Sequence, residues 1–276
     1  WLSELVANDP KRHLGVASIP LLFDVEQAVE AVRWCHENGL KGVMLPTLWG
    51  EHAAYHDIKY DPFWEACQDL GIVIHFHSGP APHNEYFGPA FPHEDRSAEL
   101  PGAMGAYVSE VMFWLYRPLT FMLWGGVFER FPRLKAMVVE GGTMFMVPSW
   151  LMLLDHNYTD IQFSAKLGDF RSHLSMAPSE YFARNCGIGA SCVPRRDLDM
   201  RDQIGIKQIM WGSDFPHPEG TWPNTAQYYQ DTFKGFDIDA GRQILGGNAI
   251  EFYGLDRQYL DGLAAEIGPS SSIFNS

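Results

Sequence analysis

The sequence predicts an α/β protein in which helices cover a parallel sheet on both sides. Apolar runs rich in β-branched residues alternate along the chain with segments of helical spacing, which is the order of elements in βαβ units. The apolar runs show no regular exchange of apolar and polar residues, as expected of strands that are buried on both faces. A doubly wound sheet and a (β/α)8 barrel both fit these observations.

Start and stop signals bound several of the helices. Asp24 caps a helix that Gly39 ends, and Pro62 stands in the first turn of the next helix, which ends at Gly71. The remaining helices are predicted from their apolar spacing. Helices are expected over residues 1–8, 24–38, 61–70, 104–130, 145–156, 197–204, 224–234 and 240–253, with some helix within 160–174.

Short apolar runs between these helices are the predicted strands, and one long loop interrupts the series. Residues 80–101 are rich in Pro, His and Phe, and a loop of this length is expected to be a functional lid. No linker divides the chain, so residues 1–268 are predicted to form a single domain, followed by a frayed tail over 269–276. The strands are expected over residues 13–20, 42–46, 72–79, 134–142, 181–189 and 208–214.

Charge and cysteine content limit the partners and the compartment. The formal net charge is -14 and no run of Lys or Arg occurs, which argues against nucleic acid and anionic membranes as partners. The four cysteines are scattered without a CxxC pair, which is typical of free thiols in a reducing compartment and predicts a cytoplasmic protein.

The most apolar segment, residues 111–127, is predicted to be a helix without a membrane role. Arg117 and Pro118 divide it, so neither half could span a bilayer. Its aromatic residues occupy more than one helical face, and a helix that is apolar all round must be buried on several sides. We therefore expect it to pack on the sheet and to form part of a subunit interface in a homo-oligomer, a dimer.

Three predicted strands end in side chains that suit a metal ion. His75 and His77 share a face near the end of the third strand, Glu140 ends the fourth strand, and Asp214 ends the sixth. Burying such groups is costly unless they are paired or bind a cation. Imidazole and carboxylate together suit zinc, manganese or iron. The pattern therefore predicts a metal site at the carboxyl ends of these strands.

The segments HFHSG, VVEGG and WGSDFPHPEGTWPN, followed by GGNAIEFYGLD, resemble the second amidohydrolase family of the amidohydrolase superfamily. The resemblance covers essentially the whole chain and implies a (β/α)8 barrel with one divalent metal at its carboxyl face. His77 matches the histidine that ends strand five of the family, and Asp214 matches the aspartate that ends strand eight. Glu140 stands where the family usually has a histidine at the end of strand six.

Counted back from Asp214, the six predicted strands correspond to strands three to eight of such a barrel. Strand one of the family carries two metal ligands, as HxH or acid-x-His, and no such pair precedes His75. We therefore expect a TIM-like (β/α)8 barrel that lacks strands one and two. The chain is predicted to be a fragment that carries little or no metal.

The resemblance implies a metal-dependent hydrolase, in which metal-activated water attacks a carbonyl group of a small-molecule substrate. Zinc is the metal expected first, ahead of manganese and iron. An alternative on the same site is a non-oxidative decarboxylase of an aromatic or unsaturated carboxylic acid. A further alternative is a catalytically silent barrel that acts as a binding module.

Each candidate residue receives a role from this resemblance. His77 and Asp214 are the predicted metal ligands, and Asp214 and Glu140 are the predicted catalytic carboxylates, with Asp214 accepting a proton from water. The predicted substrate contacts are His75, His217 and Trp49. For these three residues and for Glu140 the alternative is a structural role, which is packing inside the barrel, an ion pair or a surface position.

Overall fold

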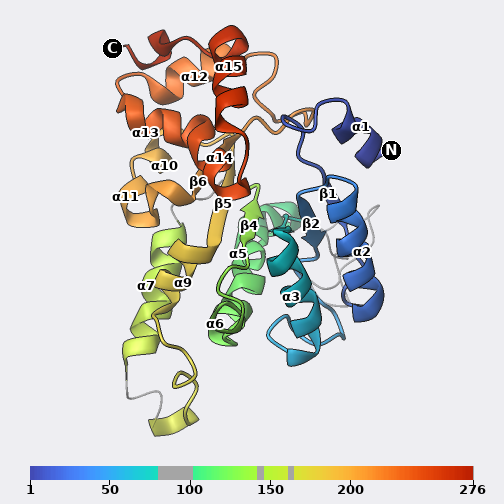
Figure 1. Ribbon diagram of the computed structural model, residues 1–276. Coiled ribbons are helices and arrows are strands. Elements are labelled where there is room, and N and C mark those ends of the chain that lie inside the picture. The colour runs from blue at the N-terminus through green and yellow to red at the C-terminus, as the bar shows by residue number, and fades with distance from the viewer. Residues whose placement is uncertain (80–101, 142–145, 161–164, 276) are drawn as a thin grey trace.

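The computed structural model describes residues 1–79, 102–141, 146–160 and 165–275. Its centre is a sheet of six parallel strands that lie side by side in the order of the chain (Figure 1). This is the order of a (β/α)8 barrel, whereas a doubly wound sheet reverses its order at a switch point. The barrel class is therefore confirmed, and the sheet of the described residues is open, with β1 and β6 as its edges. The strands are β1 (Val16–Ser18), β2 (Gly42–Leu45), β3 (Val73–Phe76), β4 (Ala136–Val139), β5 (Cys186–Ser191) and β6 (Ile209–Gly212).

Helices connect successive strands and pack around the sheet. In Figure 1, α2 and α3 lie together on one flank and α7 and α9 on the other, while α12 to α15 gather at the end of the molecule where the chain finishes. The helices are α1 (Leu2–Ala7), α2 (Val25–Glu37), η1 (Ile58–Tyr60), α3 (Asp61–Leu70), α5 (Ala103–Trp124), α6 (Val127–Arg130), α7 (Met146–Thr159), α9 (Pro178–Asn185), α10 (Arg195–Leu198), α11 (Arg201–Ile204), η3 (Ile206–Gln208), α12 (Thr225–Phe233), α13 (Ile238–Arg242), a π-helical turn η4 (Gln243–Gly247), α14 (Asn248–Tyr253), α15 (Arg257–Ile267) and η5 (Ser271–Phe274).

The predicted helix signals between β1 and β3 are confirmed. The Asp24 side chain accepts a hydrogen bond from the backbone N–H of Gln27 at 3.0 Å and so caps α2. Gly71 ends α3 in the left-handed conformation with φ of 65°. Phe63 and Trp64 of α3 are fully buried in the main core, so the helix is held chiefly by the apolar area that it removes from water.

The two faces of the sheet carry different side chains. Ile74, Phe76 and Val138 belong to the main core, which the surrounding helices cover. On the opposite, inner face a separate apolar cluster lies near the amino ends of the strands, where α14 closes the sheet. Successive side chains of a strand point to opposite faces of the sheet, and this alternation separates the main core from the inner cluster. The inner cluster consists of Val73, Met137 and Met210, with Val139, Ala249, Phe252 and Tyr253 packed against it.

The fifth strand begins later than the sequence predicted. The expected strand over residues 181–189 is wrong in its first half, because Tyr181 and Phe182 are buried residues of α9. The strand β5 itself runs over Cys186–Ser191. Burial on one face of a helix and burial in a strand give the same short apolar run, so the sequence could not separate them.

The long apolar helix is interrupted before the predicted end at residue 130. α5 runs through Pro118 to Trp124, and Gly125 and Gly126 separate it from α6. Gly126 has a positive φ of 68°, which a helix interior does not allow. No helix in the described part of the chain is both long and apolar enough to cross a membrane. The predicted lid, residues 80–101, lies outside the described residues.

The carboxyl-terminal part of the chain also differs from expectation. The helix predicted over 240–253 is divided into α13, η4 and α14, and α15 was not predicted. The tail expected to fray contains η5, in which Ile273 and Phe274 are buried. Phe274 packs on Phe233 with ring centroids 6.0 Å apart, and its carbonyl oxygen accepts from the N–H of Gly235. Two apolar residues are therefore enough to hold this part of a Ser-rich tail on the domain.

Candidate active site

Three strand ends bring polar side chains together at the carboxyl edge of the sheet. His77 directly follows β3, Glu140 directly follows β4, and Asp214 stands two residues after β6. His77 Nε2 lies 3.3 Å from Glu140 Oε2, and the Asp214 carboxyl group lies close enough to Glu140 for the charge of Glu140 to raise its pKa. Glu140 therefore lies near both the imidazole of His77 and the carboxylate of Asp214.

The backbone at this edge adopts a conformation that is rare for residues with side chains. Glu140, Cys192 and Asp214 have φ values of 54°, 48° and 58°, and no other non-glycine residue in the described ranges has a positive φ. They follow three consecutive strands, β4, β5 and β6. The left-handed conformation costs roughly 1–2 kcal/mol for such a residue. Backbone costs of this kind cluster at functional sites, so they support a functional role for this edge.

Ser78 orients the Glu140 carboxylate through its hydroxyl group and sets the tautomer of His77 through its carbonyl oxygen. Its hydroxyl donates to Glu140 Oε2 at 2.5 Å, and its carbonyl oxygen lies 2.6 Å from His77 Nδ1. Because a carbonyl oxygen can only accept, Nδ1 carries the proton in the neutral imidazole. The lone pair is then on Nε2, the nitrogen that faces Glu140 and that a metal would need. The sequence did not single out Ser78, although it directly follows His77.

The contact between two carboxyl groups has an electrostatic consequence. Burial raises the pKa of Asp214, and the charge of Glu140 raises it further, while His217 acts in the opposite direction. Two carboxylates in contact cannot both be ionised without mutual repulsion. The Asp214 side chain is only 17% exposed, so water relieves this repulsion incompletely. A cation beside the pair would remove it.

The loop after β6 places two more polar residues beside Asp214. His217 Nδ1 lies 3.5 Å from Asp214 Oδ2 and 3.5 Å from Glu219 Oε1. A turn holds the loop, with the N–H of His217 donating to the Asp214 carbonyl oxygen at 2.8 Å. A Cβ atom on Gly220 would lie 2.7 Å from the same oxygen, so the turn requires glycine there. Ligand atoms of Asp214, His217 and Glu219 all lie within 4.8 Å of one another. Glu219 was not among the predicted site residues.

Cys192 borders the same loop as a neutral thiol. All four cysteines of the chain are free, and Cys192 is the one that is not fully buried. Its Sγ lies 3.8 Å from the carbonyl oxygen of Ser213 and 3.7 Å from that of Glu219. Burial raises the pKa of the Cys192 thiol, and the nearby charge of Asp214 raises it further. The thiolate needed for nucleophilic attack or metal binding is therefore disfavoured.

Two tyrosine hydroxyl groups of α5 lie close to the loops that follow β3 and β4. The Tyr107 hydroxyl oxygen lies 3.4 Å from the position that a Cβ atom on Gly79 would take, and that of Tyr116 lies 3.1 Å from the corresponding position on Gly141. These glycines stand close after His77 and directly after Glu140. The Tyr116 hydroxyl is buried without a hydrogen-bond partner among the described residues. The two tyrosines were missed by the sequence because nothing in the pattern of α5 distinguishes them from core aromatics.

His75 does not belong to this cluster, although it was a predicted substrate contact. It is 2% exposed, its Nε2 lies 2.7 Å from the Tyr253 hydroxyl, and its Nδ1 lies 3.1 Å from the Val73 carbonyl oxygen. A Cβ atom on Gly42 would lie 2.3 Å from the His75 ring, so glycine there makes room for the imidazole. The structure thus supports the alternative of packing inside the barrel, because α14 covers the imidazole at the amino end of the sheet.

Trp49 also packs away from the cluster. Its ring contacts Phe121 with centroids 4.8 Å apart and Tyr55 at 5.7 Å, and the Arg117 guanidinium lies 4.5 Å from its centroid. None of these neighbours belongs to the group formed by His77, Glu140 and Asp214. Of the predicted site residues, the structure therefore gathers His77, Glu140, Asp214 and His217 and leaves His75 and Trp49 outside.

The donor types at this edge suit one divalent metal, and the described residues whose ligand atoms lie within 4.8 Å of one another are Asp214, His217 and Glu219. His77 Nε2 offers an imidazole lone pair and Asp214 a carboxylate, with Glu140 and His217 in contact with them. Mixed imidazole and carboxylate donors suit zinc, manganese and iron. Burial and the charge of Glu140 raise the pKa of Asp214, and a bound cation would relieve the repulsion between the two carboxylates.

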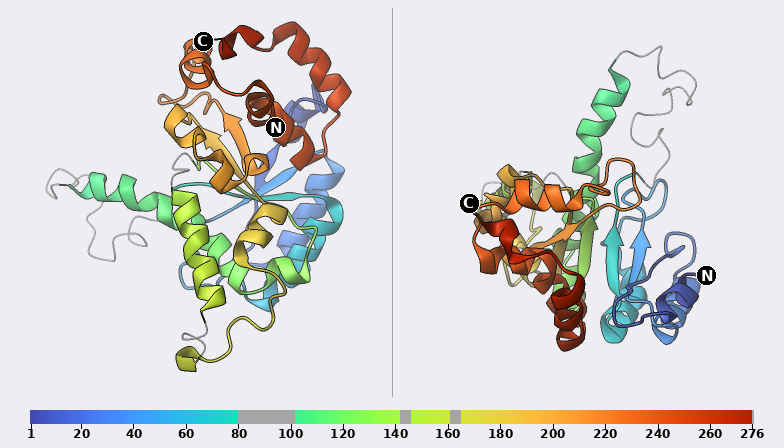
Figure 2. Two further views of the ribbon diagram at one scale, coloured as in Figure 1. Left: turned by 90° about the vertical axis from the view of Figure 1, so that its left-hand side faces the viewer. Right: turned by 90° about the horizontal axis from the view of Figure 1, so that it is seen from above.

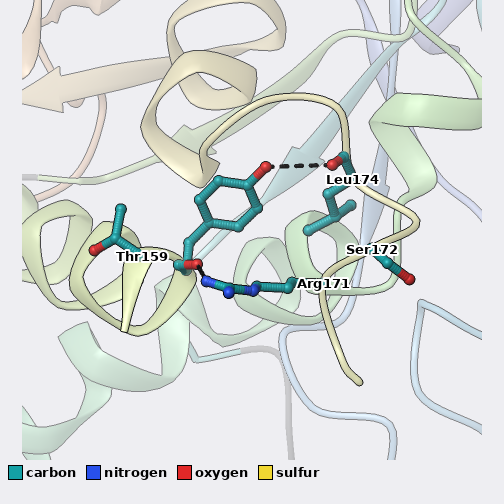
Figure 3. Close-up of a pocket in the computed structure, with 5 residues that line it drawn as sticks. Thr159, Arg171, Ser172 and Leu174 are labelled. Atoms are coloured by element: carbon teal, nitrogen blue, oxygen red, sulfur yellow. Dashed lines mark hydrogen bonds between the residues drawn. The ribbon is translucent and has the colours of Figure 1, made fainter. Parts of the chain in front are cut away.

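A separate hollow lies at the end of α7 and lacks such chemistry. Its volume is about 370 Å³. Tyr158 donates from its hydroxyl to the Leu174 carbonyl oxygen at 3.2 Å, and Arg171 donates to the Tyr158 carbonyl oxygen (Figure 3). The described residues that line it include no carboxylate, imidazole or thiol, so among them there is no catalytic group comparable to the strand-end cluster. The residues that line it are Tyr158, Thr159, Arg171, Ser172 and Leu174.

Comparison with known proteins identifies similar sequences and folds. A family model described as Amidohydrolase matches residues 1–255. The chain is 26% identical over 260 residues to 2-amino-3-carboxymuconate-6-semialdehyde decarboxylase of Dictyostelium discoideum, covering 92% of this chain and 65% of that protein. It is 26% identical over 267 residues to gamma-resorcylate decarboxylase of Polaromonas sp. (strain JS666), covering 93% and 75% respectively. The chain thus spans about two thirds to three quarters of the length of these relatives.

A solved structure supports the same fold. The dihydroxybenzoic acid decarboxylase from Polaromonas sp. JS666, solved with bound manganese and the inhibitor 2-nitroresorcinol, superposes with a TM-score of 0.67. The match covers 93% of this chain and 73% of that chain at 23% identity. At this identity the likeness establishes the fold, and the chemistry must come from the residues of this chain.

Proposed function

Because the chain belongs to the amidohydrolase family, we propose that the whole protein is a metal-dependent, non-oxidative decarboxylase of an aromatic or unsaturated carboxylic acid. The observation that carries this proposal is the grouping of His77, Glu140 and Asp214 at the carboxyl edge of the sheet, where His77 Nε2 lies 3.3 Å from Glu140 Oε2 and the charge of Glu140 raises the pKa of Asp214. The names of the two relatives favour decarboxylation over hydrolysis, which was the first expectation from the sequence.

His77 and Asp214 are the proposed ligands of one divalent metal. Zinc is proposed first from the donor set, and manganese is the main competitor because a related structure contains it. When bound, the metal supplies a positive charge that attracts an anionic substrate to an otherwise acidic site. Ser78 keeps the Nε2 lone pair of His77 available through the hydrogen bond at Nδ1.

Loss of CO2 requires a proton at a defined position. The bond between the carboxylate carbon and the substrate carbon breaks, the electron pair stays on the substrate carbon, and that carbon takes a proton. Glu140 is the proposed proton donor, because its carboxyl group contacts both Asp214 and His77. Ser78 occupies Oε2 of Glu140, which makes Oε1 the proposed position of the proton.

His217 is the proposed substrate contact at the rim of the site. Its side chain is half exposed and lies beside Asp214, so its imidazole can donate to a substrate carboxylate. The same residues would support hydrolysis if Asp214 accepted a proton from water instead. The distinction between the two reactions therefore rests on the products and is decided by experiment.

Carbon dioxide release tests the proposed reaction. The purified protein, supplied with zinc or manganese, is incubated with carboxyl-labelled hydroxybenzoates and unsaturated dicarboxylic acids, and labelled CO2 is measured by mass spectrometry. We expect release with at least one acid and its loss in Glu140→Gln, with Glu30→Gln on the exposed face of α2 as the matched control. Hydrolysis of amides or lactones without CO2 release would support the hydrolase.

Metal content tests the proposed ligands and the silent-barrel alternative. We expect about one tightly held metal per chain of the full-length protein, little or none in the chain described here, and a large loss of metal from the full-length protein in His77→Ala. The matched control is His173→Ala, because His173 is also an exposed histidine and its Nε2 contacts the Trp124 carbonyl oxygen at 2.8 Å, away from the strand-end residues. A protein that holds metal in full but converts no tested acid, amide or lactone would fit a binding module.

A further inference from the structure

One stripe of α5 carries two opposite charges and an exposed aromatic ring. Ala106, Glu110, Phe113 and Arg117 are separated by four, three and four residues, so they lie on one side of the helix. Ala106 and Glu110 are exposed, Phe113 is 64% exposed and Arg117 is half-buried. The amino-terminal half of α5 projects from the body of the molecule (Figure 2). We call these four residues the α5 stripe.

Arg117 is held in place by rings, and no anionic side chain among the described residues pairs with it. Its guanidinium lies 4.5, 5.1 and 5.5 Å from the ring centroids of Trp49, Trp114 and Phe121. Burial lowers the pKa of Arg117, which shows that it has lost part of its contact with water. Within the described part of the chain it forms no hydrogen bond or ion pair. A guanidinium fixed in this way is suited to bind a carboxylate through two parallel hydrogen bonds.

The Glu110 carboxylate lies on the same helix, about two turns before Arg117. Glu110 is exposed and also has no ion pair among the described residues. Seven residues of helix separate it from Arg117, which is roughly 10 Å along the axis. The exposed ring of Phe113 lies between the two charges. The α5 stripe therefore presents negative charge, aromatic ring and positive charge in linear order.

We propose that α5 pairs antiparallel with α5 of a second copy of this chain, so that Glu110 of each copy faces Arg117 of the other. A two-fold axis between Phe113 and Trp114 brings both charge pairs into register. The same axis places the small Ala106 side chain of each copy opposite Phe121 of the other, where large and small residues allow two helices to approach. The exposed ring of Phe113 then lies at the centre, where interfaces concentrate their binding energy.

The order of charges favours a second copy over other partners. A two-fold interface needs a surface that is complementary to itself, and opposite charges at equal distances from one point meet this condition. An acidic peptide could reach Arg117 but would be repelled by Glu110, and the chain as a whole carries a net charge of -14. This pairing specifies how the apolar helix contributes to the subunit interface that the sequence predicts.

Charge reversal provides the test. Sedimentation velocity of the purified chain over a range of concentrations is expected to show a dimer. Glu110→Arg creates two like-charge contacts across the axis, and we expect the dissociation constant of the dimer to rise on the order of a hundredfold. Glu30→Arg reverses an exposed charge on α2 and is the matched control, for which no change is expected.

Mixing two variants makes the test specific for this pairing. Arg117→Glu alone should also dissociate the dimer, but a mixture of E110R and R117E should form a heterodimer, because both contacts across the axis are again between opposite charges. Circular dichroism of each variant checks its fold, and the E110R result alone remains decisive if R117E does not fold. A monomeric parent chain, or an E110R variant as dimeric as the parent, would overturn the proposal. Because mass is measured and not turnover, this result is independent of the proposed decarboxylase activity.

Discussion

Two histidines that stand two residues apart on one face of β3 have opposite environments. His77, at the carboxyl end, is 36% exposed and contacts Glu140. His75, one step toward the amino end, is 2% exposed and bonds to the hydroxyl of Tyr253 in α14. The difference shows that position along the strand, and not residue type or facing, decides whether a polar side chain can reach a substrate.

The two ends of the sheet differ in the same way. At the carboxyl end, loops with left-handed residues leave Glu140 and Asp214 in contact with each other. At the amino end, α14 covers Met137 and Met210 with apolar side chains. This division agrees with the general rule that barrels keep chemistry at the carboxyl face and stability at the amino face. Each prediction below tests one side of this division.

The largest expected effect is on turnover, in Asp214→Asn. Asn tolerates the left-handed backbone that Asp214 adopts with φ of 58°, so the fold should be kept. The amide is a poorer metal ligand and cannot exchange a proton with Glu140, and we expect kcat/KM to fall by about 10³-fold or more. Steady-state kinetics with the acid identified in the CO2 assay measure this change. Activity within about tenfold of the parent would remove Asp214 from the mechanism.

The second effect is on stability, in His75→Leu. The substitution leaves the buried Tyr253 hydroxyl and the Val43 and Val73 carbonyl oxygens without their partner. We expect the free energy of unfolding to fall by about 3 kcal/mol, as measured by urea denaturation. Below the unfolding transition, kcat should stay within about threefold of the parent, since His75 does not touch the site.

Two controls sharpen this contrast between the ends of β3. Tyr253→Phe removes only the hydroxyl that bonds to His75, and it should cost about 1–2 kcal/mol. His77→Ala should show the reverse of His75→Leu, with turnover lost and stability little changed, because its side chain is partly exposed. If His75→Leu abolished turnover without changing stability, the assignment of His75 to the core would be wrong.

The third effect is a pH dependence that belongs to His75. Burial lowers the pKa of His75 from 6.5 to about 4, which means that the folded state binds its proton less readily than the unfolded state. The contribution to stability is complete above pH 6.5 and is lost as the pH falls toward 4. Over this window it amounts to on the order of 3 kcal/mol.

Stability curves of the parent and of His75→Leu separate this contribution from other groups. Urea unfolding at several pH values between 7 and 4 gives the free energy of unfolding for each protein. The difference between them should be largest near neutral pH and shrink as the solution is acidified. A constant difference across this range would show that His75 titrates normally in the folded protein.

The sequence predicted the fold and four of the residues that the structure gathers at the carboxyl edge, because these depend on local pattern. Apolar runs that end in His77, Glu140 or Asp214 are visible without any structure, and parallel strands necessarily bring their carboxyl ends to one edge. The position of His77 at the carboxyl end of its strand could be read from the chain, but the covering of His75 could not. Its burial depends on Tyr253, which lies 178 residues further along the chain.

The missed residues also have a physical explanation. Ser78 and Glu219 act through side-chain contacts with Glu140 and His217, and such contacts follow from loop geometry that the sequence pattern does not encode. Trp49 was assigned to the pocket from its place after β2, but neighbouring aromatic rings of α5 and the following loop enclose it. Aromatic residues near a strand end are thus ambiguous until their packing is known.

The smallest of these effects is expected in Ser78→Ala. The serine hydroxyl donates to Glu140 Oε2 at 2.5 Å, so its loss frees the carboxyl group to rotate but leaves His77 and Asp214 in place. We expect kcat to fall about tenfold, which corresponds to about 1.4 kcal/mol, with KM little changed. Ser191→Ala is the matched control, because Ser191 also ends a strand, β5, but forms no hydrogen bond with Glu140 within the described ranges. Metal content should stay as in the parent, since Ser78 donates to Glu140 and not to a proposed ligand. A loss of metal together with activity would contradict this prediction, because Ser78→Ala keeps the backbone carbonyl oxygen that contacts His77 Nδ1 and removes only the hydroxyl that donates to Glu140.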